Sequence, residues 1–288
     1  MNPVKWGNWL AGEADTSVHQ AFQVEAIASK PAPTEAVCTA QKLAQSRAPT
    51  KLSLQQKHPE LPAMAHPTET FRSRYRSEVN RHYNPWLHAG FVLGYGIVCI
   101  TLAWSSTEHI TPLQWLAVPL TLVFFNLCIY LVHRHLGHRK HTFARLFYAR
   151  HTGDHHSFFT PGHMTYDSPK DWRVILFPAW LIVLHSLIIS LPAWWLLKQL
   201  SPNVAGLFAG CMILGYLLYE VFHACEHLPA HHPVARLPWI RQMHQLHALH
   251  HRRELMQGRN FNIVLPLMDY LFGTLHWEPS AHDNQEKS

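Results

Sequence analysis

The sequence LQWLAVPLTLVFFNLCIYLV, at Leu113–Val132, is followed directly by HRHLGH at His133–His138. An α-helix needs a run of about 20 mostly apolar residues to cross the ~30 Å hydrocarbon core of a bilayer. The first segment has that length, and it contains no charged residue. The histidine-rich segment after it is therefore expected at a membrane boundary.

Three further apolar runs reach or nearly reach the same length: Leu87–Trp104, Val174–Leu197 and Val204–Phe222. Charged residues make up 15% of the chain, well below the roughly 25% of soluble domains. Four such runs close together argue against the alternative, buried helices of a soluble protein. We therefore predict an all-α integral membrane protein with four transmembrane helices in two hairpins and a cytoplasmic, helical, histidine-rich cap.

The chain of 288 residues divides by composition into three parts. Residues 1–67 are rich in Ala, Gln, Pro, Ser and Thr without a sustained apolar period, which predicts a mobile or partly ordered tail. A segment that docks on a partner or on the membrane surface is the alternative for this region. Residues 68–278 are predicted to form the membrane-embedded domain, and residues 279–288 a C-terminal tail.

Charge predicts how the spans are oriented. The turn Ser105–Pro112 carries one charged residue, Glu108, and the turn at residues 198–203 carries only Lys198, whereas residues 134–173 hold seven basic residues. The positive-inside rule therefore predicts that both termini and every histidine cluster lie on the cytoplasmic side. The net charge of +6 suits an anionic membrane surface, and no nucleic-acid-binding motif appears.

Histidine sets this sequence apart, with 25 residues against 24 Lys and Arg together. Neutral imidazole is the commonest nitrogen ligand for Zn, Cu and Fe, so metal binding is the first explanation. A structural zinc site usually needs only four ligands, and a larger set favours a dinuclear site. Ten candidate ligands fall in the four clusters HRHLGH, HTGDHH, HACEH and HALHH: His133, His138, His151, His155, His156, His223, His227, His247, His250 and His251.

The spacing within the clusters has a geometric meaning. Residues i and i+3 or i+4 share a helix face, so His151/His155, His223/His227 and His247/His250/His251 are each expected to converge on one point. Adjacent histidines diverge by about 100° on a helix and suit two metals. His133 and His138 would diverge by about 140° on a straight helix, so they sit at a frayed end or serve different metals.

Other polar residues near the clusters are alternative ligands or orienting groups. His135, His141 and His244 lie beside the clusters and are surface residues, hydrogen-bond partners of the ligands or replacement ligands. Five side chains are candidates to hold the ligand imidazoles by accepting their second N–H: Glu220, Glu226, Asp154, Asn262 and Asp269. Among these, Glu220 is the most suggestive, because an acid at the end of an apolar span is costly. Asp269 has the equal alternative of capping a helix or pairing with an arginine.

The four clusters resemble the motifs of the fatty acid hydroxylase superfamily, also called sterol desaturase-type, over about residues 71–278. DWRVILFP at Asp171–Pro178 and NFNIVLPLMDYLFGT at Asn260–Thr274 add to the likeness. The resemblance implies that the ten histidines hold a dinuclear centre, iron in the active enzyme, although zinc can occupy it on purification. It also implies an enzyme that hydroxylates or desaturates a C–H bond of a fatty acyl, sphingolipid or sterol-like lipid with O2 and two electrons.

Two features depart from the family pattern. The second cluster is H-x3-HH rather than H-x2-HH, and Ser157–Lys170 is inserted before the third span. The sequence also contains no HPGG motif of a fused cytochrome b5. We therefore expect a separate electron donor, such as a cytochrome b5-like protein, a ferredoxin or a reductase. The oligomeric state is left open.

Two functions of other classes stay as alternatives. A histidine-rich membrane zinc hydrolase would need a general base, and the chain has no HExxH motif. A metal-binding or transport protein without catalysis would need polar groups across the membrane midplane. The spans offer few such groups, chiefly Asn126 and His185.

Overall fold

The computed structural model describes residues 67–278, and this part of the chain is helical, with no β-strand beyond one isolated bridge between Thr160 and His163. Four of its segments are long and apolar enough to cross a membrane: Pro85–Ser105, Pro112–Gly137, Pro169–Leu197 and Pro202–Glu226. The predicted all-α fold with four candidate spans is confirmed. The predicted tails fall, except for Pro67, outside the described residues.

The first two spans begin with side-chain caps. Asn84 precedes α2 (Pro85–Ser105) and accepts hydrogen bonds from the backbone N–H groups of Trp86 and Leu87. Thr111 and Gln114 form a capping box around the short α3 (Pro112–Trp115). Such caps satisfy N–H groups that have no partner within the helix. The second span continues as α4 (Ala117–Val132) and then passes directly into the π-helical segment η3 (His133–Gly137).

The third span is not the single helix that the apolar run Val174–Leu197 predicts. The helix stops after Ile175 and restarts at Trp180, with Pro178 in the gap, because proline has no N–H to continue the ladder. Non-helical backbone at membrane depth is tolerated only where protein covers it. The pieces are η6 (Pro169–Asp171), α7 (Trp172–Ile175), α8 (Trp180–His185), the π-helical η7 (Ser186–Ser190) and α9 (Leu191–Leu197).

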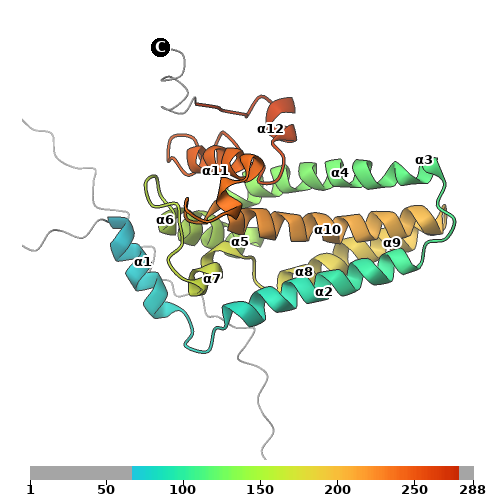
Figure 1. Ribbon diagram of the computed structural model, residues 1–288, viewed down its shortest axis with the longest axis horizontal. Coiled ribbons are helices and arrows are strands. Elements are labelled where there is room, and N and C mark those ends of the chain that lie inside the picture. The colour runs from blue at the N-terminus through green and yellow to red at the C-terminus, as the bar shows by residue number, and fades with distance from the viewer. Residues whose placement is uncertain (1–66, 279–288) are drawn as a thin grey trace, which may run out of the picture. The chain divides into compact units, whose positions relative to one another are not determined.

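The fourth span, α10 (Pro202–Glu226), is the central helix of the bundle and packs against α2, α4 and α9 (Figure 1). About 72% of its most apolar window is buried, against 11% for the first span. Glycines allow the close approach, since a Cβ at Gly210 would lie 2.1 Å from the Trp104 ring and one at Gly215 would lie 2.6 Å from the Phe125 ring. Small residues at helix contacts are typical of membrane bundles.

Both hairpin turns lie at one end of the bundle in Figure 1, and the helices that carry the histidines lie at the other. Asn203 joins the turns: its Oδ1 accepts the Glu108 N–H at 2.9 Å, and its amide donates to the Glu108 carbonyl at 2.7 Å. The two hairpins are thus fixed in register. The cytoplasmic orientation of the histidine end stays a prediction from charge.

Short helices form the cap at the histidine end. Arg76 of α1 donates to Asp171 at 2.8–2.9 Å and to Asp167 at 2.6 Å, and the buried Arg72 bonds the Thr165 carbonyl at 2.8 Å. These bonds tie α1 to the segment before the third span. The cap elements are α1 (Pro67–Glu78), η4 (Thr142–Ala144), α5 (Arg145–Tyr148), η5 (Ala149–His155), α6 (His156–Phe158), η8 (Val234–Arg236), α11 (Pro238–His250) and α12 (Leu267–Leu271).

Candidate metal centre

Nine buried histidines form two groups at the boundary between the spans and the cap. Within each group, one ring nitrogen from every residue lies within 4.8 Å of the others. We call them the five-histidine group and the four-histidine group. The first contains His133, His138, His151, His156 and His250. The second contains His155, His223, His227 and His247.

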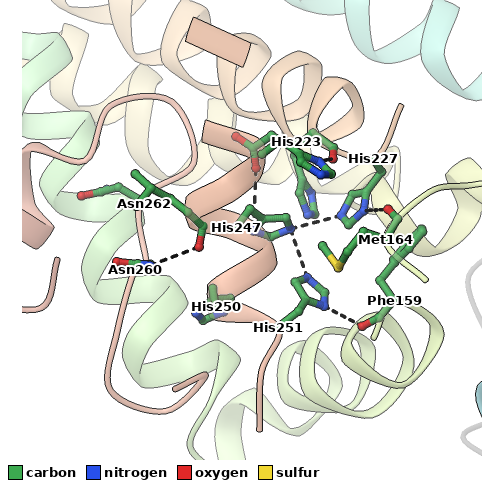
Figure 2. Close-up of polar contacts among 12 residues, drawn as sticks. Phe159, Met164, His223, His227, His247, His250, His251, Asn260 and Asn262 are labelled. Carbon is green, nitrogen blue, oxygen red and sulfur yellow. Dashed lines mark hydrogen bonds and ion pairs between the residues drawn. The ribbon is translucent and has the colours of Figure 1, made fainter. Parts of the chain in front are cut away.

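The tenth predicted histidine, His251, lies next to both groups. Its Nε2 is 3.1 Å from the Nε2 atoms of both His155 and His247, and its ring stacks on His156 at 4.1 Å. Figure 2 shows His247 with dashed contacts to His227 and His251. The structure therefore brings together all ten histidines that the clusters predict.

Hydrogen bonds alone do not account for the spacing of the ring nitrogens. The Nε2 of His138 is 2.9 Å from that of His250 and 3.1 Å from that of His151. The Nε2 of His151 also lies 3.2 Å from that of His156. A neutral ring nitrogen carries either one proton or one lone pair, so it does not serve two such contacts at once. Nitrogens bound at right angles to one metal at ~2.1 Å would lie about 3.0 Å apart. The spacing fits a shared metal ion in each group.

Backbone carbonyls orient half of the ten rings. The Nδ1–H groups of His133 and His250 donate to the carbonyls of Phe261 at 2.5 Å and Arg259 at 2.8 Å. Three more rings donate likewise: His155 to Val174, His227 to Met164 and His251 to Phe159, at 3.1, 2.7 and 2.6 Å. A proton on Nδ1 leaves the Nε2 lone pair free, which is the tautomer that a metal ligand needs.

Burial also keeps these rings neutral. None of the ten is more than 7% exposed. Because a charged imidazolium is disfavoured away from water, burial lowers the pKa of the rings outside the spans: His138, His151, His155, His156, His227, His247, His250 and His251. Neutral imidazoles bind a metal without first losing a proton. The residues present therefore fit a dinuclear, nitrogen-ligated centre.

A π-helical turn places His133 and His138 in the same group. The segment η3 follows α4 without a break and ends at Gly137, directly before His138. Because π-helical hydrogen bonds join residues i and i+5, residues five apart come close, and the two rings lie 5.1 Å apart. Of the two alternatives from the sequence, the distorted helix end is found. Separate metals for His133 and His138 are not supported.

The second cluster pairs differently from the α-helical expectation. The segment η5 is also π-helical, so His151 joins His156, five residues on, with Nε2 atoms 3.2 Å apart. His155 falls in the other group. The expectation that His151 and His155 converge on one point is therefore wrong, while the expectation that adjacent His155 and His156 serve different sites agrees with the grouping.

The other two clusters lie on α-helices. His223 and His227, at the end of α10, share the four-histidine group as predicted. On α11, His247 joins this group but His250 joins the five-histidine group. The predicted convergence of His247, His250 and His251 on a single point is therefore corrected. Instead, α11 lies between the two groups and contributes to both.

Among the predicted orienting carboxylates, Glu226 is the one beside a ligand ring. It is fully buried, and its Oε2 lies 3.7 Å from Nδ1 of His247. Glu220, which the sequence favours, accepts the backbone N–H of Phe177 with both oxygens at 3.2 Å instead. It supplies a hydrogen-bond acceptor for a backbone N–H that the interruption of the third span leaves without a helical partner. The apolar run in the sequence does not reveal this interruption.

Asp269 and Asn262 hold the loop that orients His133. Asp269 accepts the N–H groups of Phe261 and Asn262 at 2.9 and 2.7 Å and the Thr274 hydroxyl at 2.7 Å. Burial raises the pKa of the Asp269 carboxyl, and these hydrogen bonds oppose the shift. Asn262 donates to the Asn126 carbonyl at 3.1 Å. Both residues thus fix the Phe261 carbonyl, which accepts from His133.

Asp154 and the neighbouring histidines belong to neither group. Burial raises the pKa of Asp154, and the nearby Arg150 opposes the shift. Within residues 67–278, the alternative ligands His135, His141 and His244 belong to neither group, and His244 donates to the Glu226 carbonyl at 2.5 Å. The backbone carbonyls that orient the rings were not predicted from the sequence. Every residue has a carbonyl group, so no residue type marks the ones that accept from a histidine.

Comparisons with known proteins agree with this geometry. The profile of the fatty acid hydroxylase family matches residues 118–274, more than half of the chain. A dihydroceramide fatty acyl 2-hydroxylase of Arabidopsis thaliana is 28% identical over 183 residues, covering 62% of this chain and 69% of that protein. A second such hydroxylase of that plant is 32% identical over 108 residues, 37% of this chain and 41% of that protein.

The fatty acid 2-hydroxylase of Mus musculus is 29% identical over 161 residues, covering 54% of this chain and 38% of that protein. The matched stretch thus spans less than half of the second plant relative and of the mouse relative. No solved structure matches the chain. The family match covers all four histidine clusters and the loop through Thr274, and it shows that this membrane protein belongs to the fatty acid hydroxylase family, a family of oxidoreductases.

Proposed function

We propose that this chain is a membrane-bound diiron oxygenase that hydroxylates, or desaturates, a C–H bond in the hydrocarbon chain of a lipid. The observation that carries the proposal is the pair of buried histidine groups, with ring nitrogens about 3 Å apart. The family match and the relatives named as fatty acyl 2-hydroxylases support it. Hydroxylation at carbon 2 of an acyl chain is the reaction we propose first.

The ten histidines would hold two iron ions, with the five-histidine group at one and the four-histidine group at the other. His251 would complete the four-histidine group. When bound, the irons would supply the activation of O2 with two electrons that C–H oxidation needs. An all-imidazole ligand set suits iron, although zinc, copper and nickel also bind it, so zinc in purified protein would not contradict the proposal.

The chain's own residues do three things in this proposal. Carbonyls of Phe159, Met164, Val174, Arg259 and Phe261 fix the ring orientations. The packed spans and cap exclude water from the ring nitrogens, which protects an oxidising centre from side reactions. Because the centre lies at the ends of the spans, a lipid chain reaches it without leaving the apolar phase.

The charge distribution supports a cytoplasmic position for the centre and both termini. Electrons would then come from a separate cytoplasmic-side donor, a cytochrome b5-like protein, a ferredoxin or a reductase. The lipid partner would be a fatty acyl, sphingolipid or sterol-like molecule within the bilayer.

The test is metal and product analysis of the full chain in lipid nanodiscs. Iron-replete protein should contain two iron ions per chain. With an electron donor, a fatty acyl lipid and isotopically labelled O2, it should yield a product that carries one labelled oxygen, or one that has lost two hydrogens. Fewer than two metal ions per chain, or no O2-dependent product from the two-iron protein, would contradict the proposal. Zinc together with hydrolysis of the lipid would point to the hydrolase alternative.

A further inference from the structure

A small cavity lies beside the five-histidine group, among α4, α5, α10 and the gap in the third span. It has a volume of about 10 Å³, roughly the space of one water molecule. Two candidate ligands, His133 and His151, form its inner wall. The rest of its lining is apolar or aromatic: Ile129, Val132, Phe147, Phe177 and Tyr219.

One wall of this cavity is held rigidly by the interrupted third span. Phe177 lies in the gap between α7 and α8, where its backbone has lost helical partners. Glu220 of α10 accepts its N–H, and Nε2 of His88 of α2 lies 3.0 Å from its carbonyl oxygen. Its ring stacks on Tyr219 with centroids 5.1 Å apart and planes at 8°. Backbone contacts from two spans thus fix Phe177 against the cavity.

The opposite wall is less constrained. Phe147 belongs to the four-residue helix α5, and its ring lies 5.5 Å from Phe177 and 6.4 Å from His151. Its neighbours Phe143 and Leu146 are 80% and 56% exposed. Large apolar side chains exposed beside a membrane span face lipid at little cost. Phe147 therefore separates a lipid-facing surface from a ligand histidine.

The chemistry of the lining selects for hydrocarbon. Apart from the two imidazoles and the Tyr219 hydroxyl, the lining offers no hydrogen-bonding side chain. An apolar, concave site of this kind takes an alkyl segment and disfavours water. The present volume is too small for an alkyl chain, so a side chain of the lining must move before one enters.

We propose that the hydrocarbon chain of the substrate enters from the bilayer between α4 and α5, past Phe147, and lies against Ile129, Val132, Phe177 and Tyr219. This inference rests on the proposed function. It assigns the route of the hydrocarbon chain and the wall of the cavity that determines which carbon atom reaches the metal ions. Phe147 acts as the gate. Phe177 and Tyr219 form the fixed wall, held in place by Glu220 and His88.

The first arm of the test maps the route independently of turnover. Metal-loaded full chain in nanodiscs is irradiated with a palmitic acid probe that carries a mid-chain diazirine, and the labelled residues are identified by mass spectrometry. Label should concentrate at Ile129, Phe147 and Phe177, and excess palmitic acid should reduce it. Equal labelling of the lipid-facing Leu131, or labelling that palmitic acid does not reduce, would overturn the route.

The second arm uses matched substitutions at neighbouring positions. Phe147→Trp should narrow the route and lower the rate of product formation at least about 10-fold, whereas Leu146→Trp should change it less than about 2-fold. Phe147→Ala should widen the route and add products oxidised at further carbons. All three variants should keep two metal ions per chain. Equal effects at the two positions would overturn the gate.

The two proposals fail in different ways. A wild-type protein with two irons that labels at Phe147 but forms no oxidised lipid would refute the proposed function and leave the route standing. A wild-type protein that oxidises lipid but labels only at lipid-facing residues would refute the route alone.

Discussion

The two histidine groups draw on regular and distorted helices in different proportions. The four-histidine group takes His223 and His227 from the regular helix α10, with the buried Glu226 between them. The five-histidine group takes four of its members from the π-helical segments η3 and η5 and the residues that directly follow them. It also depends on the loop carbonyls of Phe261 and Arg259. The four-histidine group thus rests mainly on regular helices, with only His155 taken from η5, whereas the five-histidine group rests mainly on distorted helix ends.

This difference has a consequence for substrate access. The cavity that we propose as the hydrocarbon route opens beside His133 and His151 of the five-histidine group. His247 and His251 are buried, and Figure 2 shows His251 between His247 and Phe159. In this proposal, η3 and η5, which carry His133 and His151, lie on the side of the centre where the lipid would arrive. π-Helical turns frequently occur at functional sites.

The sharpest test of the comparison is to remove one candidate ligand from each group. His250→Ala and His247→Ala should each lower lipid oxidation more than about 100-fold, because loss of a ligand exceeds the effect of losing an orienting partner. Each variant should retain close to one metal ion per chain, measured by elemental analysis.

The matched control for these ligands is His141→Ala, since His141 belongs to neither group. It should keep both metal ions and wild-type activity. If His250→Ala and His247→Ala each lose both metal ions, the ten histidines form one inseparable site and do not divide into two independent groups.

The next effect concerns the distorted segment alone. A Cβ at Gly137 would lie 2.9 Å from Cδ2 of His151, so Gly137→Ala should displace that ring. We expect a loss of activity of roughly 10- to 100-fold, with metal lost first from the five-histidine group. Activity assays and metal titration measure both.

Gly153→Ala serves as the control, because nothing lies within 4 Å of its added Cβ. It lies in the neighbouring π-helical segment η5 and should leave the metal content at two. Wild-type metal affinity in Gly137→Ala would show that the five-histidine group tolerates displacement of the His151 ring.

The features built on regular helices were predictable from the sequence, whereas those built on distorted segments were not. The apolar runs gave the four spans, because hydrophobic length is a local property of the chain. Spacing on an α-helix gave the pairing of His223 with His227. The pairing of His151 with His156 was not predictable from spacing, because it depends on π-helical turns that no residue type announces. Likewise, the contact of Glu220 with Phe177 depends on where the third span is interrupted.

A third prediction tests the carboxylate of the four-histidine group. Glu226→Gln keeps the size of the side chain but replaces a carboxyl group, whose Oε2 lies 3.7 Å from Nδ1 of His247, by an amide that cannot take up a proton. Metal affinity of this group should fall about 10-fold, the lower end of the effect of orienting carboxylates. Competition with a metal chelator measures the change.

Glu220→Gln is the matched control, since Glu220 is equally buried in the same helix but bonds the Phe177 backbone. It should leave metal affinity unchanged, because an amide oxygen still accepts the Phe177 N–H. The contradicting result is that Glu220→Gln weakens metal binding as much as Glu226→Gln does. In that case the effect would come from replacing any buried acid of α10, and not from the contact of Glu226 with His247.

The smallest effect is expected from the loop that supports the five-histidine group. Asp269→Asn leaves one oxygen to accept the N–H groups of Phe261 and Asn262, and an unpaired buried donor costs about 1–3 kcal/mol. The free energy of unfolding should fall by that amount, and metal affinity only a few-fold, because Phe261 holds His133 through one hydrogen bond. Denaturant titration measures the first quantity and chelator competition the second. Loss of a whole metal ion in Asp269→Asn would show that this loop governs the five-histidine group as strongly as its own ligands do.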